Sequence, residues 1–185
     1  MSIRNEIEEF ILKFPIYQYD FLDVGEIEFH DKIRNYCKKD CAHYNKSWSC
    51  PPAVGKPAYC QARCKDYNQA LFFSSVGQYA AVEKADWKTH PKLQHDKMTR
   101  IIENFMKKQG LPVYTLTSEA CAMCRKCGFP REHCRHPEEM YPCIESHCIQ
   151  VSDLVEKCGM DYYLDENLFL WFSIIFFRDL PDKVF

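Results

Sequence analysis

Glycine is scarce in this chain, and the glycine-rich loops that bind phosphates are missing. Among six glycines there is no Gly-x-Gly-x-x-Gly and no Gly-x4-Gly-Lys-Ser/Thr pattern, so dinucleotide and nucleotide phosphate loops are not indicated. The His-Glu-x-x-His pattern of zinc peptidases and the Gly-x-Ser-x-Gly turn of hydrolases are missing as well. The common motif-bearing enzyme classes therefore receive no support.

Long apolar runs and an excess of one charge are also lacking. The longest apolar run, Leu168 to Phe177, is about half as long as a membrane-crossing helix, and the first residues do not read as a signal peptide. With 24 Lys+Arg against 26 Asp+Glu, no basic field favours nucleic acid. We expect a cytoplasmic protein that binds neither membrane nor nucleic acid.

Cysteine is the residue present in excess, with 12 in 185 residues. A chain of this length with 46% hydrophobic residues can bury a core as one domain, 1–185, without the disulfides that tiny secreted domains need. In a reducing cytoplasm, clustered cysteines indicate metal or redox chemistry. Most of them fall in two segments, 37–64 and 121–148.

Hydrophobic periodicity places regular elements around these segments. Helices are predicted at 3–13, 90–109 and 151–157, and strands at 16–24, 27–29, 70–76, 113–116 and 168–177. The last strand is continuously apolar, so we expect it at the centre of a sheet. The order predicts an α/β (α+β) fold with a mixed β-sheet, flanking helices and two long cysteine-rich metal-binding loops.

The second segment carries the most specific signal, Cys121-x2-Cys124-x2-Cys127 followed by Cys134. Thiols at every third residue of a tight loop can turn toward one central group, and an iron–sulfur cluster takes one thiolate per iron. The spacing differs from that of bacterial ferredoxins, so their fold is not implied. Disulfides are one alternative, and a Cys3His zinc site is another, built from Cys121, Cys124 and Cys134 with His133 or His136.

The first segment, Cys37-x3-Cys41-x8-Cys50-Pro-Pro, is followed by Cys60-x3-Cys64. Proline after a ligand cysteine stiffens the loop. Three interpretations stay open: a second cluster whose fourth ligand is Cys60 or Cys64, a zinc ion on the same set, or a three-cysteine cluster with one iron open to a substrate. The Cys-x3-Cys-x2-Cys spacing of radical S-adenosylmethionine enzymes is missing, so that class is rejected.

The roles of several other residues stay open. Cys143 follows a proline and is either an additional ligand or a core residue, and Cys148 and Cys158 are equally open, because free cysteine is often buried as a small hydrophobe. The histidines among the cysteines are ligands, neighbours of ligands or surface residues. Tyr44 and Trp48 are expected to shield a site from water.

These motifs resemble those of a family of predicted metal-binding proteins whose function is not established. The family pattern is a cysteine pair, a tyrosine-containing turn and Cys-Pro-Pro, then Cys-x2-Cys-x2-Cys and Cys-Arg-His-Pro, and the likeness runs from Glu26 to the last strand. The chain departs from it with Cys143 where serine is usual and Cys148 where glycine is usual. The resemblance implies no reaction, but it implies metal binding through Cys37, Cys41, Cys50, Cys121, Cys124, Cys127 and Cys134.

The favoured function is an iron–sulfur protein with two 4Fe-4S clusters that transfers electrons or gives redox support to a partner protein. One alternative is an enzyme that uses an open-iron 4Fe-4S cluster on a small-molecule substrate. The other is a zinc-stabilised interaction module. The predicted ligands are Cys37, Cys41, Cys50, Cys60, Cys64, Cys121, Cys124, Cys127 and Cys134.

Overall fold

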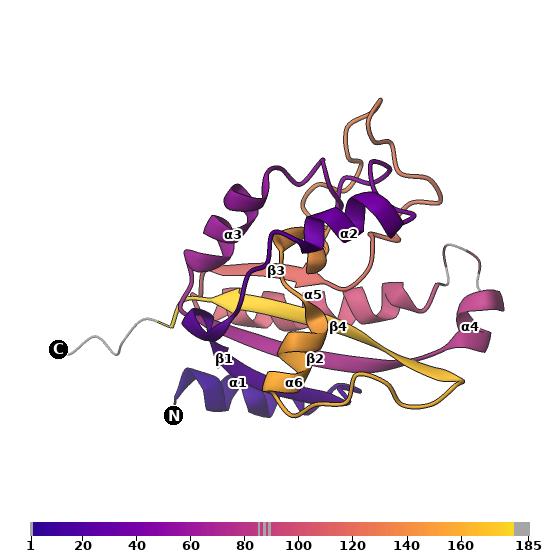
Figure 1. Ribbon diagram of the computed structural model, residues 1–185. Coiled ribbons are helices and arrows are strands. Elements are labelled where there is room, and N and C mark those ends of the chain that lie inside the picture. Colours follow the sequence, from indigo (N-terminus) through magenta and orange to yellow (C-terminus); the bar gives the residue numbers. More distant parts are fainter. Residues whose placement is uncertain (1, 85, 87, 89, 180–185) are drawn as a thin grey trace.

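An antiparallel four-stranded sheet forms the centre of the computed structural model, which describes residues 2–84, 86, 88 and 90–179 (Figure 1). The strand order is β1-β2-β4-β3, and β4 lies between β2 and β3 as its continuous apolarity predicts. The strands are β1 Gln18–Asp23, β2 Gln69–Gln78, β3 Val113–Thr117 and β4 Leu168–Phe177.

Helices cover both faces of this sheet. They are α1 Ile3–Ile11, α2 Ile33–Asp40, α3 Pro57–Lys65, α4 Tyr79–Lys84, α5 Lys92–Lys108 and α6 Val151–Lys157, with 3-10 turns η1 Val24–Glu26 and η2 Glu145–His147. Residues of α1 and α5 pack on one face, and residues of α6 and the segment before it pack on the other. No helix in the described part of the chain is long and apolar enough to cross a membrane.

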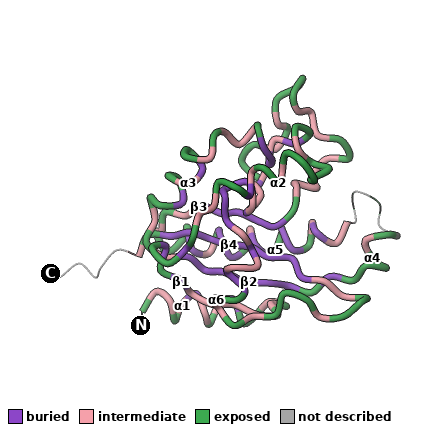
Figure 2. Tube along the Cα trace, viewed as in Figure 1, coloured by how far each residue is buried: buried purple, intermediate pink, exposed green. Residues whose placement is uncertain are grey.

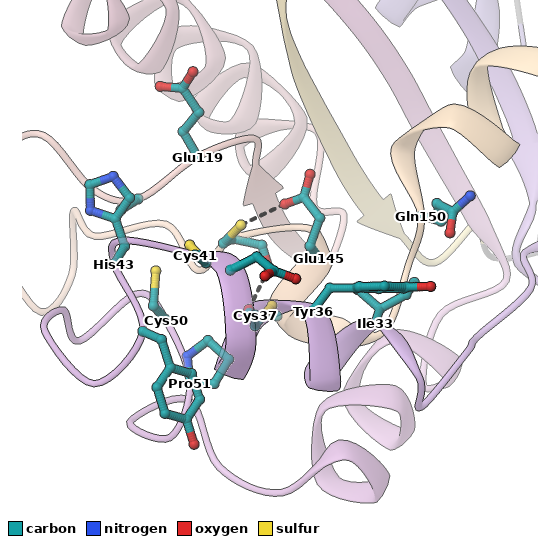
Figure 3. Close-up of a pocket in the computed structure, with 15 residues that line it drawn as sticks. Ile33, Tyr36, Cys37, Cys41, His43, Cys50, Pro51, Glu119, Glu145 and Gln150 are labelled. Carbon is teal, nitrogen blue, oxygen red and sulfur yellow. Dashed lines mark hydrogen bonds between the residues drawn. The ribbon is translucent and has the colours of Figure 1, made fainter.

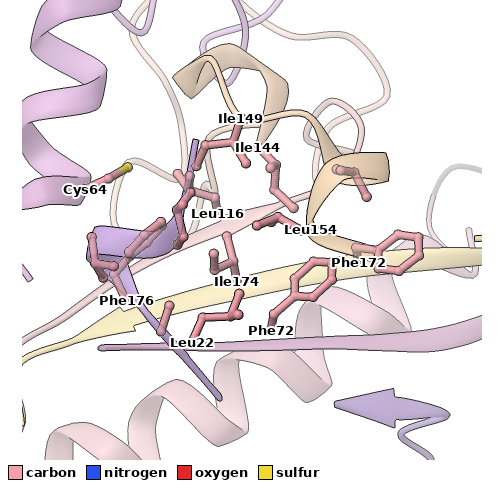
Figure 4. Close-up of a cluster of buried hydrophobic side chains, with 14 of the residues drawn as sticks. Leu22, Cys64, Phe72, Leu116, Ile144, Ile149, Leu154, Phe172, Ile174 and Phe176 are labelled. Atoms are coloured by element: carbon pink, nitrogen blue, oxygen red, sulfur yellow. The ribbon is translucent and has the colours of Figure 1, made fainter. Parts of the chain in front are cut away.

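The two cores follow from the alternation of side chains along the strands. Phe72, Phe172 and Phe176 lie on the α6 side (Figure 4), whereas Phe73 and Phe177 lie on the α1 and α5 side. Both central strands are buried along most of their length (Figure 2), so each contributes to both cores. The sheet is thereby a rigid base for the loops at its edge.

Most predicted elements are present, and the α+β class is confirmed. The structure differs from the prediction in the relative direction of the strands and in the conformation of the cysteine segments. All three strand ladders are antiparallel rather than mixed, and the parallel pairing is an isolated bridge between Thr117 and Cys143. Residues 27–29 form no strand, and the segment 37–64 is partly helical, with α2 and α3 inside or overlapping it.

A buried polar network joins α5 to the sheet. His95 is 3% exposed, its Nδ1 lies 2.7 Å from Ser75 Oγ, and its Nε2 lies 2.7 Å from Ser173 Oγ. Burial, and secondarily the nearby positive charge of Lys92, lower the pKa of His95 from 6.5 to about 3. The imidazole is therefore neutral in the folded protein at any pH near neutrality.

This lowered pKa predicts acid sensitivity. The unfolded chain takes up a proton below pH 6.5 and the folded chain does not, so the contribution of His95 is complete above pH 6.5 and is lost as the pH falls toward 3. Between pH 7 and 5 we expect a loss of about 2 kcal/mol from this residue. Urea unfolding at both pH values should show a change about 2 kcal/mol smaller for His95→Gln than for the parent.

Gln94→Ala, at an exposed position of the same helix, provides the control, because it removes no titratable group and should keep the parent's pH dependence. An unchanged pH dependence in His95→Gln would show that the buried imidazole is not the source.

Candidate metal centre

Four cysteines line one cavity of about 480 Å³ at the end of the molecule that carries α2 (Figure 3). We call it the thiol cavity and define it by Cys37, Cys41, Cys50 and Cys143. Three of these come from the first predicted segment, and Cys143 comes from the second. The thiol cavity therefore joins segments that are far apart in the sequence.

Local structure delivers each of these thiols. Cys37 lies on α2, and Cys41 caps the C-terminus of that helix in an extended conformation. A turn closed by the bond from Cys50 N to Ser47 O, 3.2 Å, precedes the two prolines. Cys143 is held by its backbone N–H, which donates to Ser49 O at 3.0 Å. All four positions are thus fixed by backbone contacts.

The pKa values of Cys37, Cys50 and Cys143 are raised. Burial is the main cause at Cys50, a hydrogen bond with Ser49 opposes it, the charges of Cys41 and Cys37 add to it, and the resulting pKa is about 11. The pKa of Cys37 is raised by burial, then by Cys41. Cys143 has a pKa well above 9.0 because it is buried and lies beside Glu145, whose Oε2 accepts its S–H at 2.6 Å.

Positive charge reaches the thiol cavity from one side. The Arg34 guanidinium donates to the carbonyls of Ser146 and Gly55, and its charge lowers the pKa of Cys37 against the larger effect of burial. Metal binding requires thiolates, and a nearby fixed cation favours them. Arg34 therefore favours metal binding at this cavity.

Cys60 and Cys64 lie elsewhere. Both are fully buried on α3, Cys60 Sγ donates to Val54 O at 3.4 Å, and Cys64 belongs to the core on the α6 side of the sheet. Neither lines the thiol cavity. Burial is the main cause that raises the pKa of each. Their predicted ligand role stays a prediction, while their position is that of core residues.

The second cysteine segment forms a separate site. Cys121, Cys124, Cys127 and Cys134 line a small hollow of about 20 Å³, together with Trp48, Arg135 and His136 among others. His133 is exposed outside it. We call these four cysteines the second thiol set. In the part of the chain that the structure describes, no three His, Cys, Asp or Glu side chains converge as ligands of one ion do.

Charges from the fold also act on the second thiol set. Burial raises the pKa of Cys121 to about 11, a hydrogen bond from the Met123 backbone lowers it, and the charges of Asp96 and Lys92 act in opposite directions. A hydrogen bond with Cys124 is the largest cause that raises the pKa of Arg135. The Arg135 guanidinium therefore lies beside the Cys124 side chain.

Two residues of the first segment hold the two sites together. The Ser49 Oγ accepts from Cys121 N at 2.9 Å and lies 3.7 Å from Cys50 Sγ. Trp48 Nε1 donates to Glu132 O at 3.0 Å, and its ring meets Phe129 edge-on at 4.9 Å. The thiol cavity and the second thiol set are consequently neighbours, joined through one buried serine.

Replacing this serine should loosen the junction. Ser49 is fully buried, and Ser49→Ala leaves the Cys121 N–H without its acceptor, which costs about 1–3 kcal/mol. Urea unfolding of the protein as purified measures this loss. Ser152→Ala, on a half-exposed serine of α6, should stay within about 0.5 kcal/mol of the parent. Equal stabilities for the two variants would contradict a joining role for Ser49.

Several of these residues carried no signal in the sequence. Ser49, Lys92 and Glu119 fit none of the motifs, and only the folded chain brings them to the cysteines. The prediction that aromatic residues shield the sites agrees with their placement, since Tyr44 lines the thiol cavity and Trp48 lines the second hollow. All twelve cysteines are described, and none is in a disulfide.

Comparison with known proteins gives one match. The model of a family described as "Predicted metal-binding protein (DUF2284)" matches residues 20–177, which include both cysteine segments. No curated protein and no solved structure matches the chain.

Proposed function

The chain belongs to this family of predicted metal-binding proteins, and on that basis we propose that it is an iron–sulfur protein that carries electrons for a partner. Cys37, Cys41, Cys50 and Cys143 would hold one 4Fe-4S cluster. The second thiol set would hold the other.

The single observation that carries the proposal is the thiol cavity. Four thiols line one space of about 480 Å³, whereas a water molecule takes about 30 Å³ in the liquid. Four thiolates match the four irons of a cuboidal cluster, and the space exceeds the needs of a lone ion. The donor set therefore fits the larger inorganic group.

Cys143 decides between electron transfer and open-iron chemistry. A set of three cysteines would leave one iron for a substrate, as the open position of a catalytic zinc does. With Cys143 in the thiol cavity, the set is complete at four. This favours electron transfer over the open-iron enzyme that the sequence also allowed.

When bound, such clusters supply reversible one-electron transfer at a potential set by charge, hydrogen bonds and solvent exposure. The chain provides charge and a graded solvent exposure at the two cysteine sets. Arg34 and Arg135 bring positive charge to the two cysteine sets. Trp48 covers the second hollow, while Cys41 is exposed to solvent at the rim of the first. The exposed rim is where we propose that a redox partner approaches.

Zinc is a second candidate, for the second thiol set alone. Its hollow measures about 20 Å³, close to the space that one water needs. A single zinc ion with four thiolates at about 2.3 Å requires less opening of this loop than a cluster does. In that case the second segment would be a structural support for the first site.

Spectroscopy under strict exclusion of oxygen tests the proposal. The protein is expected to be brown, with a broad visible absorption that bleaches on addition of dithionite. A colourless protein with zinc at near-stoichiometric level and no iron would overturn the proposal and select the zinc-stabilised module. Zinc together with a bleachable chromophore would assign zinc to the second thiol set.

A further inference from the structure

A second cavity of about 390 Å³ lies against the thiol cavity. Glu119 and Glu145 line both of them, so the two spaces meet at these carboxylates. Figure 3 shows both side chains at the thiol cavity, which they border. The second cavity is built by the first residues of β4, the segment before that strand and the residues that follow β3. We call it the aromatic cavity.

Aromatic rings form much of its wall. The rings of Tyr162 and Phe172 are stacked at 6.0 Å and 14°, and Phe169 meets Trp171 edge-on at 4.6 Å. Tyr162 is 58% exposed, so one of its faces stays accessible to a ligand. Stacked rings accept flat molecules, and the negative face of an aromatic ring attracts cations.

Apart from the imidazole of His90, the ionisable side chains of the lining other than tyrosine are carboxylates. Glu119 and Glu145 supply carboxylates, and no lysine or arginine occurs among the described residues that line the aromatic cavity. Tyr162 lies close enough to Glu145 that this carboxylate contributes, after burial, to raising the tyrosine's pKa. The carboxylates and the aromatic rings therefore line the same cavity, where both can contact one ligand.

One polar atom in the wall lacks a partner. Trp171 is 2% exposed, and its Nε1 has no hydrogen-bond partner among the described atoms. A buried donor of this kind usually finds an acceptor in a neighbouring group, a water or a ligand. Trp171 also lines a third cavity, beside Ser75 and His95, so the missing acceptor belongs to either space.

From these features we propose that the aromatic cavity binds a flat organic cation, with its ring on the exposed face of Tyr162 and its positive charge toward Glu119 and Glu145. The site lies directly beside the thiol cavity. The proposed binding of the cation does not depend on which metal group the cysteines bind, because aromatic rings and carboxylates supply its contacts.

Isothermal titration of the full-length protein tests this with a matched pair of probes. 1-Methylnicotinamide is a flat cation with a carboxamide, and nicotinamide has the same ring without the charge. We expect the cation to bind at least about tenfold more tightly, since a tenfold ratio corresponds to 1.4 kcal/mol, within the reach of cation–π and carboxylate contacts.

Two exposed positions supply the variants. Glu119→Gln should weaken the cation by about fivefold to tenfold and leave the neutral probe unchanged, and Tyr162→Leu should weaken both probes. Tyr59→Leu is the control, because Tyr59 is exposed on α3 and lines neither cavity.

Equal affinity for the two probes, no measurable binding of the cation, or parent-like binding in both Glu119→Gln and Tyr162→Leu would each overturn the inference. Iron and sulfide content, measured on the same samples, reports separately on the iron–sulfur proposal. Failure of one is therefore distinguishable from failure of the other.

Discussion

Cys143→Ala is expected to remove about half of the iron from protein purified without oxygen, from about eight to about four per chain, since each 4Fe-4S cluster takes one thiolate per iron. The reason is geometric. Cys143 is the fourth thiol that lines the thiol cavity, and its backbone N–H fixes it to Ser49. Without it the remaining three thiolates leave one iron without a protein ligand. Iron analysis together with visible absorption measures the loss.

Cys60→Ala is the matched comparison, because Cys60 is a fully buried cysteine of α3 outside the thiol cavity. We expect it to keep the parent's iron content. Cys158→Ala, outside both cysteine sets, should do the same. If Cys60→Ala lost the iron and Cys143→Ala kept it, Cys60, one of the two fourth ligands that the sequence offered, would be right and the proposed set wrong.

The second large effect is expected at Lys92. Its side chain is 1% exposed, and its Nζ donates to Asp96 Oδ1 at 2.8 Å and to Thr117 Oγ1 at 3.2 Å. Lys92→Met removes the partner of a largely buried carboxylate, which costs about 3–5 kcal/mol. Urea unfolding of the parent and the variant gives this difference.

A double substitution separates the charge from the packing. Replacing both ions by apolar groups is often neutral, so Lys92→Met/Asp96→Leu should recover most of the stability. Lys107→Met breaks an ion pair of the same helical spacing with Glu103, but Lys107 is 53% exposed, and a loss below about 1 kcal/mol is expected. A double variant less stable than Lys92→Met would contradict this account of the buried pair.

The regular elements could be predicted because their signal is local. Helix α5 has a clear 3.6-residue period, and α6 ends at Lys157, two residues before Gly159, which has a positive φ of 62°. Strand β4 is apolar at every position except Ser173. Strand direction has no such local signal, and the mixed sheet that the element order indicated is antiparallel in its ladders.

The cysteine sites were predictable in part. Spacing grouped Cys121, Cys124, Cys127 and Cys134, and the fold places all four at one hollow. Spacing also grouped Cys37, Cys41 and Cys50, but it offered the nearest cysteines along the chain as the fourth ligand. Cys143 is a neighbour only through the backbone contact with Ser49 and the bridge to Thr117, and such long-range contacts leave no periodic trace in a sequence.

Helix α3 shows why spacing alone does not distinguish ligand cysteines from core cysteines. The four-residue spacing of Cys60 and Cys64 puts both on one helical face. This spacing is equally compatible with a pair of metal ligands and with two buried core residues. In the folded chain that face packs inward, and both thiols are fully buried. Burial depends on what the helix packs against, which only the tertiary structure fixes.

The stoichiometry of iron and acid-labile sulfide in protein purified without oxygen tests the central claim most directly. The two-cluster arrangement predicts about eight of each per chain. About four of each with one zinc would keep the cluster at Cys37, Cys41, Cys50 and Cys143 and assign zinc to the second thiol set. Protein with neither iron nor sulfide would contradict the account.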